Sequence, residues 1–286
     1  MRVEIIKPGM YSTIQDSGRV GRQSYGVPIG GYLDRYAAHF ANTLVGNEIH
    51  SPLIEATLIG PEMVFDTPCV IAVTGGDLNA RINDVSIEQN RRIYLETGHR
   101  LSMGNAITGC RAYIAIGGEW LVKKWLGSAS AINGLYSLLT PDSILGKRSI
   151  IEINTSIPNL EVRLSQTQWN RKIKVHILPG PEYHMFDQQS LNQLFDTQIM
   201  ISTQSNRIGI RLEKYLEKYE IPNEMMSSGV LPGTIQLTHE GQPIILLADA
   251  QTTGGYPRIA KVIDEDLDAL AQFKPGDMIE LIWMHI

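Results

Sequence analysis

Short runs of residues that favour β-strands recur along the whole chain between glycine, proline and asparagine. Each run has about four to six residues, which suits the strands of barrels and sandwiches. Helices of the length that a βαβ array needs do not alternate with them. The sequence therefore predicts a mainly β protein with a few short helices. The clearest runs are 70–73, 91–95, 113–116, 174–178 and 244–247.

Two helices are predicted. The first ends at Gly46, and its apolar residues follow the spacing i, i+3, i+4 and i+7 of an amphipathic helix. These residues are Leu33, Tyr36, Ala37, Phe40, Ala41 and Leu44. We expect this helix to lie on the first β domain. A shorter helix is predicted from Asp264 toward Phe273, because the acidic residues after Asp264 suit the positive end of a helix dipole.

Three features of the first half of the chain return in the same order in the second half. They are a strand that runs into Pro-Gly, the triplet Thr-Gly-Gly, and a glycine that introduces an apolar strand. They occur at 3–9, 74–76 and 98–99, and again at 175–180, 253–255 and 276–277. Since 286 residues also exceed one ordinary domain of about 100–200 residues, we predict two related β domains, 1–168 and 169–286.

Composition excludes several classes of protein. The net charge is −5, whereas a protein that binds nucleic acid needs an excess of Lys and Arg on one face, so we expect no nucleic-acid partner. No apolar run approaches the roughly 20 residues of a membrane span. Charged residues interrupt the first apolar patch, unlike a signal peptide. We therefore expect a cytoplasmic protein without membrane contact.

Metal and redox chemistry find little support. Cys69 and Cys110 have no second Cys or His nearby at metal-ligand spacing, so we expect buried free thiols. The seven histidines are scattered, and we expect no metal site. The sequence also lacks a Walker-type loop, a Gly-x-Ser-x-Gly elbow and a dinucleotide fingerprint.

The densest polar cluster follows the first strands and contains Gln15, Asp16, Arg19 and Asp34 among several glycines. Glycines let backbone N–H groups approach an anion, and arginine binds a carboxylate or phosphate with two parallel hydrogen bonds. The cluster therefore suits an anion-binding loop. The alternative is a long connection that its own Asp and Arg hold shut.

A second polar cluster follows directly after the apolar run 244–247. It contains Asp249, Gln251, Thr252, Thr253 and Arg258 around two glycines. Polar groups at the end of a buried strand are well placed to line a pocket, although a tight turn explains the glycines equally well. Elsewhere, Glu55 stands in an apolar run, where burial raises a carboxyl pKa toward the range of a general base. A structural acid is the alternative there. Arg111 and the pair Arg207 and Arg211 could balance such carboxylates or bind phosphates, although solvent-exposed arginines are commoner.

Motifs spread over nearly the whole chain form one recognisable set. Its segments are 8–9, 15–19, 26–28, 34, 41–47, 53–61, 109–113, 117–118, 178–181, 233–236 and 251–257. Together they resemble the family of KipA and allophanate hydrolase subunit 2. In that family the fold is two tandem cyclophilin-like β-barrel domains, which agrees with the strand rhythm and the repeat.

The resemblance implies an activity and partners. It implies the C-type subunit of an ATP-dependent 5-oxoprolinase, a hydrolase that cleaves 5-oxo-L-proline to L-glutamate and is active only in a complex. The implied partners are a KipI-like protein as the B-type subunit and a LamB/YcsF-like protein as the A-type subunit, with a small-molecule substrate and ATP.

Positions in the matching motifs and the two polar clusters suggest roles for individual residues. Asp16, Glu55 or Asp249 would activate the nucleophile, and Arg19, Arg111 and Arg258 would neutralise developing phosphate charge. The other residues expected to bind substrate or phosphate are Gln15, Asp34, Asn42, Gln236, Gln251, Thr252 and Thr253.

Two alternatives remain open on the sequence. One is a biotin-dependent carboxyltransferase component, in which biotin is attached elsewhere because this chain has no Met-Lys-Met motif. The other is a non-catalytic regulator of the KipA type that binds a KipI-like kinase inhibitor. Two departures from the family pattern bear on this choice: Ala129 replaces the usual Arg, and Asn206 replaces the usual Asp.

Overall fold

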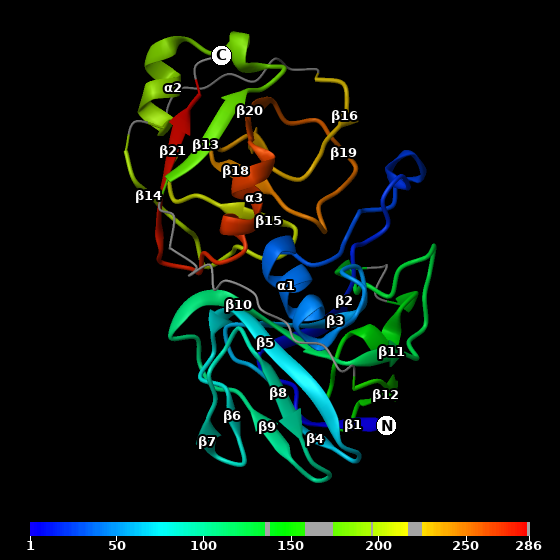
Figure 1. Cartoon of the computed structure of the whole chain (residues 1–286). Helices are drawn as coiled ribbons and strands as arrows, with labels where there is room; N and C mark the ends of the chain where they lie inside the picture. Colours follow the sequence, from blue (N-terminus) through cyan, green and yellow to red (C-terminus); the bar gives the residue numbers. More distant parts are fainter. Residues whose placement is uncertain (135–137, 158–173, 196, 217–224, 285–286) are drawn as a thin grey trace. The chain divides into compact units, whose positions relative to one another are not determined.

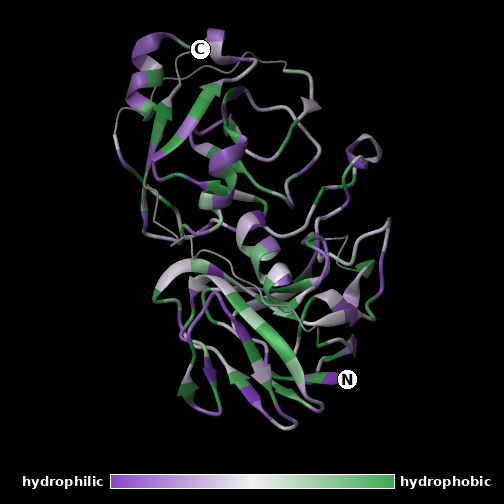
Figure 2. Ribbon diagram, viewed as in Figure 1, coloured by the Kyte–Doolittle hydropathy of each residue, from purple (hydrophilic) through white to green (hydrophobic). Residues whose placement is uncertain are grey.

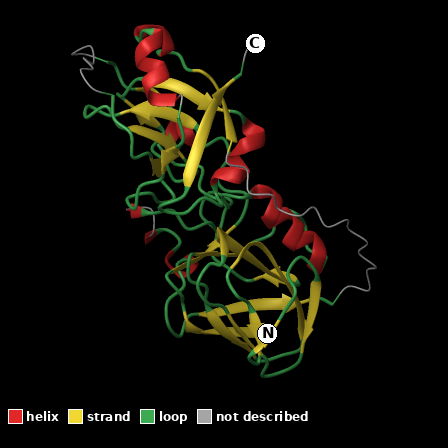
Figure 3. Cartoon of the chain, turned by 90° about the vertical axis from the view of Figure 1, so that its left-hand side faces the viewer, coloured by secondary structure: helices red, strands yellow, loops and turns green. Residues whose placement is uncertain are grey.

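The computed structural model describes residues 1–134, 138–157, 174–195, 197–216 and 225–284. Strands dominate these residues and three short α-helices accompany them, which confirms the predicted fold class (Figures 1 and 3). The chain forms two compact units. Unit 1 comprises Met1–Arg19 and Gly30–Asn170, and unit 2 comprises Val20–Ile29 and Arg171–Ile286. The domain boundary predicted at 168/169 lies outside the described residues.

Unit 1 contains two antiparallel sheets. Their strand orders are β11-β12-β1-β4-β9-β6-β7 and β2-β3-β10-β5-β8. Side chains from both sheets, such as Val3 and Phe65 from the first and Ile54 and Ile114 from the second, share one apolar core. Hydrophobic residues accordingly run along these strands (Figure 2). The strands are β1 (Arg2–Lys7), β2 (Tyr11–Gln15), β3 (Leu53–Thr57), β4 (Glu62–Phe65), β5 (Cys69–Asp77), β6 (Arg81–Ile82), β7 (Val85–Ser86), β8 (Arg92–Leu95), β9 (Arg100–Ser102), β10 (Thr108–Ile116), β11 (Gly118–Trp120) and β12 (Ile150–Thr155).

Helix α1 (Arg35–Val45) packs on the five-stranded sheet of unit 1, as predicted. Its apolar face, which includes Ala41, meets the outer face of β5 and β10. The Asp34 carboxylate accepts a 2.8 Å hydrogen bond from the N–H of Ala37 and so caps the helix. At the other end Gly46 has φ 79°, the left-handed conformation that ends a helix.

Unit 2 is built around a seven-stranded sheet of order β14-β21-β13-β20-β17-β18-β15, with a separate β16-β19 pair. All pairs are antiparallel except β13 with β21. The elements are β13 (Lys174–Pro179), α2 (Gln188–Phe195), β14 (Ile199–Met200), β15 (Gly209–Arg211), β16 (Ser228–Gly229), β17 (Thr234–Leu237), β18 (Pro243–Leu246), β19 (Thr253–Gly254), β20 (Arg258–Val262), α3 (Asp264–Leu270) and β21 (Met278–Trp283).

The second predicted helix is α3, which begins at Asp264 and ends at Leu270, three residues before the predicted end. Its buried Asp266 does more than complement the helix dipole. The carboxylate accepts a 2.8 Å hydrogen bond from the backbone N–H of His176, and it lies 2.8 Å from Nδ1 of the same residue. The acidic first turn therefore fastens α3 to β13.

The repeated features keep their order along the chain but differ in strand pairing. In unit 1, β1 pairs antiparallel with β4 and β12, whereas β13 in unit 2 pairs parallel with β21. The first Thr-Gly-Gly lies inside the nine-residue β5, and the second begins the two-residue β19. The repeated sequence features therefore lie in strands that pair differently in the two units.

Both cysteines are buried free thiols, as predicted. Burial raises the pKa of the Cys69 thiol to about 12, and the nearby Asp66 charge adds to this effect.

The Asp34 cap gives a test of the first helix. We expect Asp34→Ala to lower the free energy of unfolding of unit 1 by about 1 kcal/mol, because the first turn of α1 loses its acceptor. Asp34→Asn keeps an acceptor and should lose less. Urea unfolding followed by circular dichroism measures both, and equal losses would contradict the capping role.

Candidate functional site

Asp16, a predicted catalytic carboxylate, is buried at the end of β2. It accepts hydrogen bonds from Ser128 Oγ at 2.5 Å, Ser130 Oγ at 2.6 Å, Ala129 N at 2.7 Å and Gly18 N at 2.9 Å. These four hydrogen bonds hold the carboxylate in one orientation. Asp16 therefore ties β2 to the segment 128–130, and the family departure at Ala129 keeps the N–H that it needs.

Arg19 ties the same segment from a second side. Its side chain is buried, and Nε donates to the carbonyl oxygen of Trp125 at 3.0 Å. Nη2 donates to the carbonyls of Ser128 and Ser130 at 3.2 and 2.9 Å. The guanidinium also lies 5.1 Å from the centre of the Trp125 ring. Asp16 and Arg19 thus hold this loop in place through hydrogen bonds to the segment 125–130. This agrees with the second interpretation of the cluster, a connection held shut by its own Asp and Arg.

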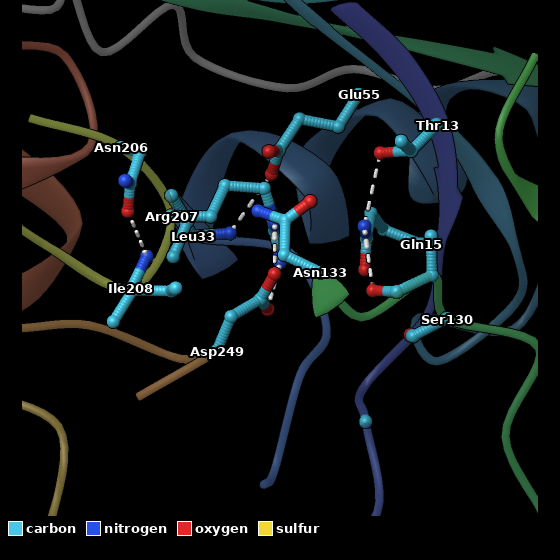
Figure 4. A network of polar contacts seen from close by, with 12 residues as sticks. Thr13, Gln15, Leu33, Glu55, Ser130, Asn133, Asn206, Arg207, Ile208 and Asp249 are labelled. Atoms are coloured by element: carbon cyan, nitrogen blue, oxygen red, sulfur yellow. Dashed lines mark hydrogen bonds and ion pairs between the residues drawn. The ribbon is translucent and has the colours of Figure 1, made fainter. Parts of the chain in front are cut away.

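Glu55 is fully buried on β3. Its Oε2 accepts from the N–H of Leu33 at 2.9 Å (Figure 4). The same oxygen accepts from the Tyr113 hydroxyl at 3.0 Å, and Oε1 lies 3.7 Å from Arg111 Nε. Burial raises the pKa of the Tyr113 phenol well above 10.0, and the charges of Glu55 and Asp34 raise it further. Tyr113 therefore stays a proton donor, and the structure brings Glu55 and Arg111 together as a buried pair.

Gln15 and Asn42, two predicted binding residues of unit 1, use their amides inside the unit. Gln15 is buried, and its Nε2 donates to Thr13 Oγ1 at 2.9 Å and to the Ala131 carbonyl at 3.2 Å (Figure 4). Asn42 Nδ2 donates to the Ser51 carbonyl at 2.9 Å. Like Asp34, which caps α1, both residues thus have hydrogen-bond partners within unit 1.

In unit 2 the predicted Asp249 forms a buried ion pair with Arg207. Arg207 Nε and Nη2 donate to the two carboxylate oxygens at 3.1 and 2.9 Å, and the side chains are 2% and 0% exposed (Figure 4). The sequence suggested Arg207 either as a balancing charge or as a phosphate ligand, and the structure shows it balancing Asp249. Asn206 Oδ1 accepts from the N–H of Ile208 at 2.7 Å, so this amide makes the turn contact that a carboxylate can also make.

Arg258 is the third predicted phosphate-binding arginine, and it pairs with Glu182. Its Nε and Nη2 donate to the two carboxylate oxygens at 2.8 and 2.6 Å, and Nη1 donates to the Gly229 carbonyl at 3.0 Å. The hydrogen bonds from Arg258 hold the pKa of Glu182 below its ordinary value. A phosphate at Arg258 has to displace this carboxylate.

The side-chain amides of the predicted residues Gln236 and Gln251 are hydrogen-bonded to each other. Gln236 is buried, and its Nε2 donates to the carbonyl of Tyr256 at 3.2 Å. Its Oε1 accepts from Gln251 Nε2 at 3.2 Å. Thr253 lies on β19, where it pairs with Gly229. The glycines beside these residues leave little room, since a side chain at Gly254 would lie 2.7 Å from Gln236 Nε2.

A small hollow in unit 2 brings together segments from both predicted polar clusters. It is shallow, and its volume of about 210 Å³ includes the adjoining open solvent. Gln23, Pro28 and Ile29 line it from the segment that joins unit 2, and Leu247, Gln251 and Thr252 line it from the loop after β18. The sequence indicated Gln251 and Thr252 but missed Gln23, because nothing local marks a loop glutamine as the wall of a pocket.

The described residues contain no cluster of three or more His, Cys, Asp and Glu side chains suited to a metal ion. Among their helices, none has the length and apolar character needed to cross a bilayer.

Fold and site together define a two-unit β protein with buried acid–arginine pairs and an amide-lined hollow in its second unit. Comparison with known proteins shows to which family the chain belongs. Residues 25–283 match the family described as carboxyltransferase domain, subdomain A and B, and the chain belongs to this family.

Among characterised relatives, the C-type subunit of 5-oxoprolinase from Escherichia coli is 38% identical over 98% of this chain and 90% of its own length. Urea amidolyase of Saccharomyces cerevisiae is 33% identical over 98% of this chain, which spans 16% of that protein.

Solved structures support the fold as well. Kluyveromyces lactis urea carboxylase has a TM-score of 0.85 at 30% identity, over 99% of this chain and 27% of that one. TTHA0988 has a TM-score of 0.85 at 27% identity, over 98% of this chain and 55% of that one. These likenesses agree with the predicted tandem β-barrel-like domains.

The Arg207–Asp249 pair yields a stability prediction. Arg207→Met or Asp249→Leu alone should cost about 3–5 kcal/mol, because each leaves a buried charge without its partner. The double variant should lose less than either single one, since it removes both charges. Chemical unfolding of the variants measures these losses in the free energy of unfolding.

Glu88→Gln, in an exposed pair with Arg91, serves as a control that should change the free energy of unfolding by less than about 1 kcal/mol. Additive losses in the double variant would contradict the prediction.

The Arg258–Glu182 pair yields a pH prediction. Because the pKa of Glu182 is lowered in the folded state, its contribution to stability is present above its ordinary pKa of 4.5 and is lost as pH falls through the folded value. Glu182→Gln should therefore lower the melting temperature at pH 7, and the difference from the parent should shrink in acid. Glu213→Gln, at an exposed position of unit 2, is the matched control. A pH-independent difference would refute the pairing effect.

Proposed function

We propose that this chain is the C-type subunit of an ATP-dependent 5-oxoprolinase, which opens 5-oxo-L-proline to L-glutamate together with partner subunits. The observation that carries the proposal is the 38% identity to the Escherichia coli protein over nearly the full length of both chains. The Haemophilus influenzae protein of the same name is 31% identical over 97% of this chain and 90% of its own length.

A carboxyltransferase component of a urea amidolyase is the second candidate. Two such enzymes match 98% of this chain at 32% and 33% identity. The fold is compatible with either function, because unrelated chemistries share one scaffold. The higher identity to the Escherichia coli 5-oxoprolinase component favours the first candidate.

Partner subunits are part of the proposal, since the relatives are named as subunits. We propose a KipI-like and a LamB/YcsF-like protein as the partners. The contacts of the arginines support a division of labour within such a complex. Arg19 donates to three carbonyl groups and Arg258 pairs with Glu182, so neither guanidinium suits a triphosphate without losing these partners. The phosphates of ATP would then be held elsewhere in the complex.

The carboxylates of this chain fit a positioning role more readily than proton transfer. Asp16 accepts four hydrogen bonds and Asp249 is paired with Arg207, both in buried surroundings. Carboxylates held by this many protein partners have fixed orientations. A catalytic role for Asp16, Glu55 or Asp249 stays a prediction.

Reconstitution tests the proposed function. The purified chain is mixed with its KipI-like and LamB/YcsF-like partners, and glutamate and phosphate release are followed with 5-oxo-L-proline and ATP. We expect both products from the complete mixture and from no mixture that lacks this chain. A stable complex without substrate-dependent ATP hydrolysis would favour the regulator. A biotinylated partner in a native pull-down would favour the carboxyltransferase.

A further inference from the structure

We propose that Asn133 is a site of spontaneous covalent modification, at which the side-chain amide is lost and aspartate or isoaspartate is formed. The site is independent of the proposed function. Asparagine is among the thermally labile residues, and Asn133 is the one asparagine of the chain that a glycine follows. Because glycine has no side chain, the asparagine side chain can approach the backbone nitrogen of Gly134 closely.

The backbone at Gly134 favours this approach. Gly134 is exposed, and its φ is 81°. A Cβ atom placed on it would have no atom within 4 Å other than those of its chain neighbours. A residue with a side chain is strained at such a φ, so the local conformation selects the residue type that leaves the nitrogen accessible.

The Tyr11 hydroxyl activates the amide that is lost. It donates to Asn133 Oδ1 at 2.6 Å, which is short for a hydrogen bond between two oxygens. Tyr11 begins β2 and pairs with Thr57 of β3, so the sheet fixes where this donor lies. A donor on a carbonyl oxygen stabilises the negative charge that a nucleophile creates there when it attacks the carbonyl carbon.

The reaction needs water as its only co-reactant. The Gly134 nitrogen forms a bond to Cγ of Asn133, the bond from Cγ to Nδ2 breaks, and the proton of the Gly134 nitrogen leaves with the NH2 group as ammonia. Water then opens the succinimide ring. Opening at Cγ gives aspartate, whereas opening at the main-chain carbonyl carbon gives isoaspartate, and nothing is oxidised or reduced. Both reacting groups belong to one chain, so no encounter step is required.

The two products affect unit 1 differently. Aspartate keeps an oxygen that accepts from the Tyr11 hydroxyl and adds one negative charge. Isoaspartate instead lengthens the main chain, and it does so two residues after Ala131, whose carbonyl accepts from Gln15 Nε2 at 3.2 Å. We expect isoaspartate to weaken this contact and so to loosen Gln15.

Mass spectrometry of the folded full chain tests the site. The chain is incubated at neutral pH in water enriched in heavy oxygen, and its peptides are mapped at intervals. Asn83 is the internal control, since it is exposed and its Oδ1 accepts from the N–H of Arg100 at 3.0 Å, but Asp84 follows it. We expect heavy oxygen to enter Asn133 at least about tenfold faster than Asn83, because the Asp84 side chain obstructs its backbone nitrogen. No uptake at Asn133, or equal uptake at both sites, would overturn the proposal.

Variants separate the contribution of the fold from that of the sequence. Tyr11→Phe removes the donor and should slow conversion of the folded chain about tenfold, the effect of one hydrogen bond to a developing charge. In urea, where the contact is lost from both chains, the parent and Tyr11→Phe should convert at one rate. Tyr94→Phe, at a tyrosine that is 62% exposed, is the matched control and should leave the rate unchanged. A folded Tyr11→Phe chain that converts as fast as the folded parent would refute activation by Tyr11.

Asn133→Gln tests the site without removing Tyr11. The substitution keeps an amide oxygen as acceptor, but cyclisation then requires a larger ring that closes less readily. Conversion at position 133 should fall to the level of Asn83. Conversion at the parent rate would show that another reaction introduces the heavy oxygen and would refute the proposal, even if Tyr11→Phe does not fold.

Discussion

The buried charges of Asp16 and Arg19 are the constraint on which the candidate region of unit 1 depends. A charge removed from water must find hydrogen-bond partners, and these two side chains find theirs on one segment, 125–130. They therefore fix both the end of β2 and the loop that faces it. Arg19 is also the last residue of unit 1 before the chain enters Val20–Ile29. The same contacts thus set the point at which the chain leaves the unit.

Local structure was largely predictable from the sequence. The run 70–73 lies in β5, the run 244–247 overlaps β18, and the helix before Gly46 has its predicted stop. In each case the signal is carried by neighbours in sequence, through alternation, helical spacing or a glycine in the left-handed conformation. The predicted end of α3 was three residues too late. The apolar residues Ala271 and Phe273 continue the helical spacing, but the helix itself ends at Leu270.

The candidate site was predictable in its residues but not in its pairings. Asp16 and Ser128 are 112 residues apart, and Arg207 and Asp249 are 42 apart, so no local pattern reveals either contact. The sequence accordingly treated Arg19, Arg111 and Arg258 as candidates for phosphate, although each has a protein carboxylate or carbonyl beside it. Gln251 and Thr252 were found because they follow a buried strand, whereas Gln23 reaches the hollow from a distant, earlier part of the chain.

The membership of Val20–Ile29 in unit 2 has a consequence for folding. This segment is synthesised well before the strands with which it is grouped, because the first of them that the structure describes, β13, begins at Lys174. Unit 2 therefore cannot be completed from its own continuous stretch of chain, and closing so long a loop makes its last step slow relative to local hairpins. During synthesis the segment has to remain accessible until the second half emerges. A ribosome-bound chain that ends before Lys174 can fold the sheets of unit 1. It already contains Val20–Ile29, which lines the hollow of unit 2, but it lacks the other residues of that hollow.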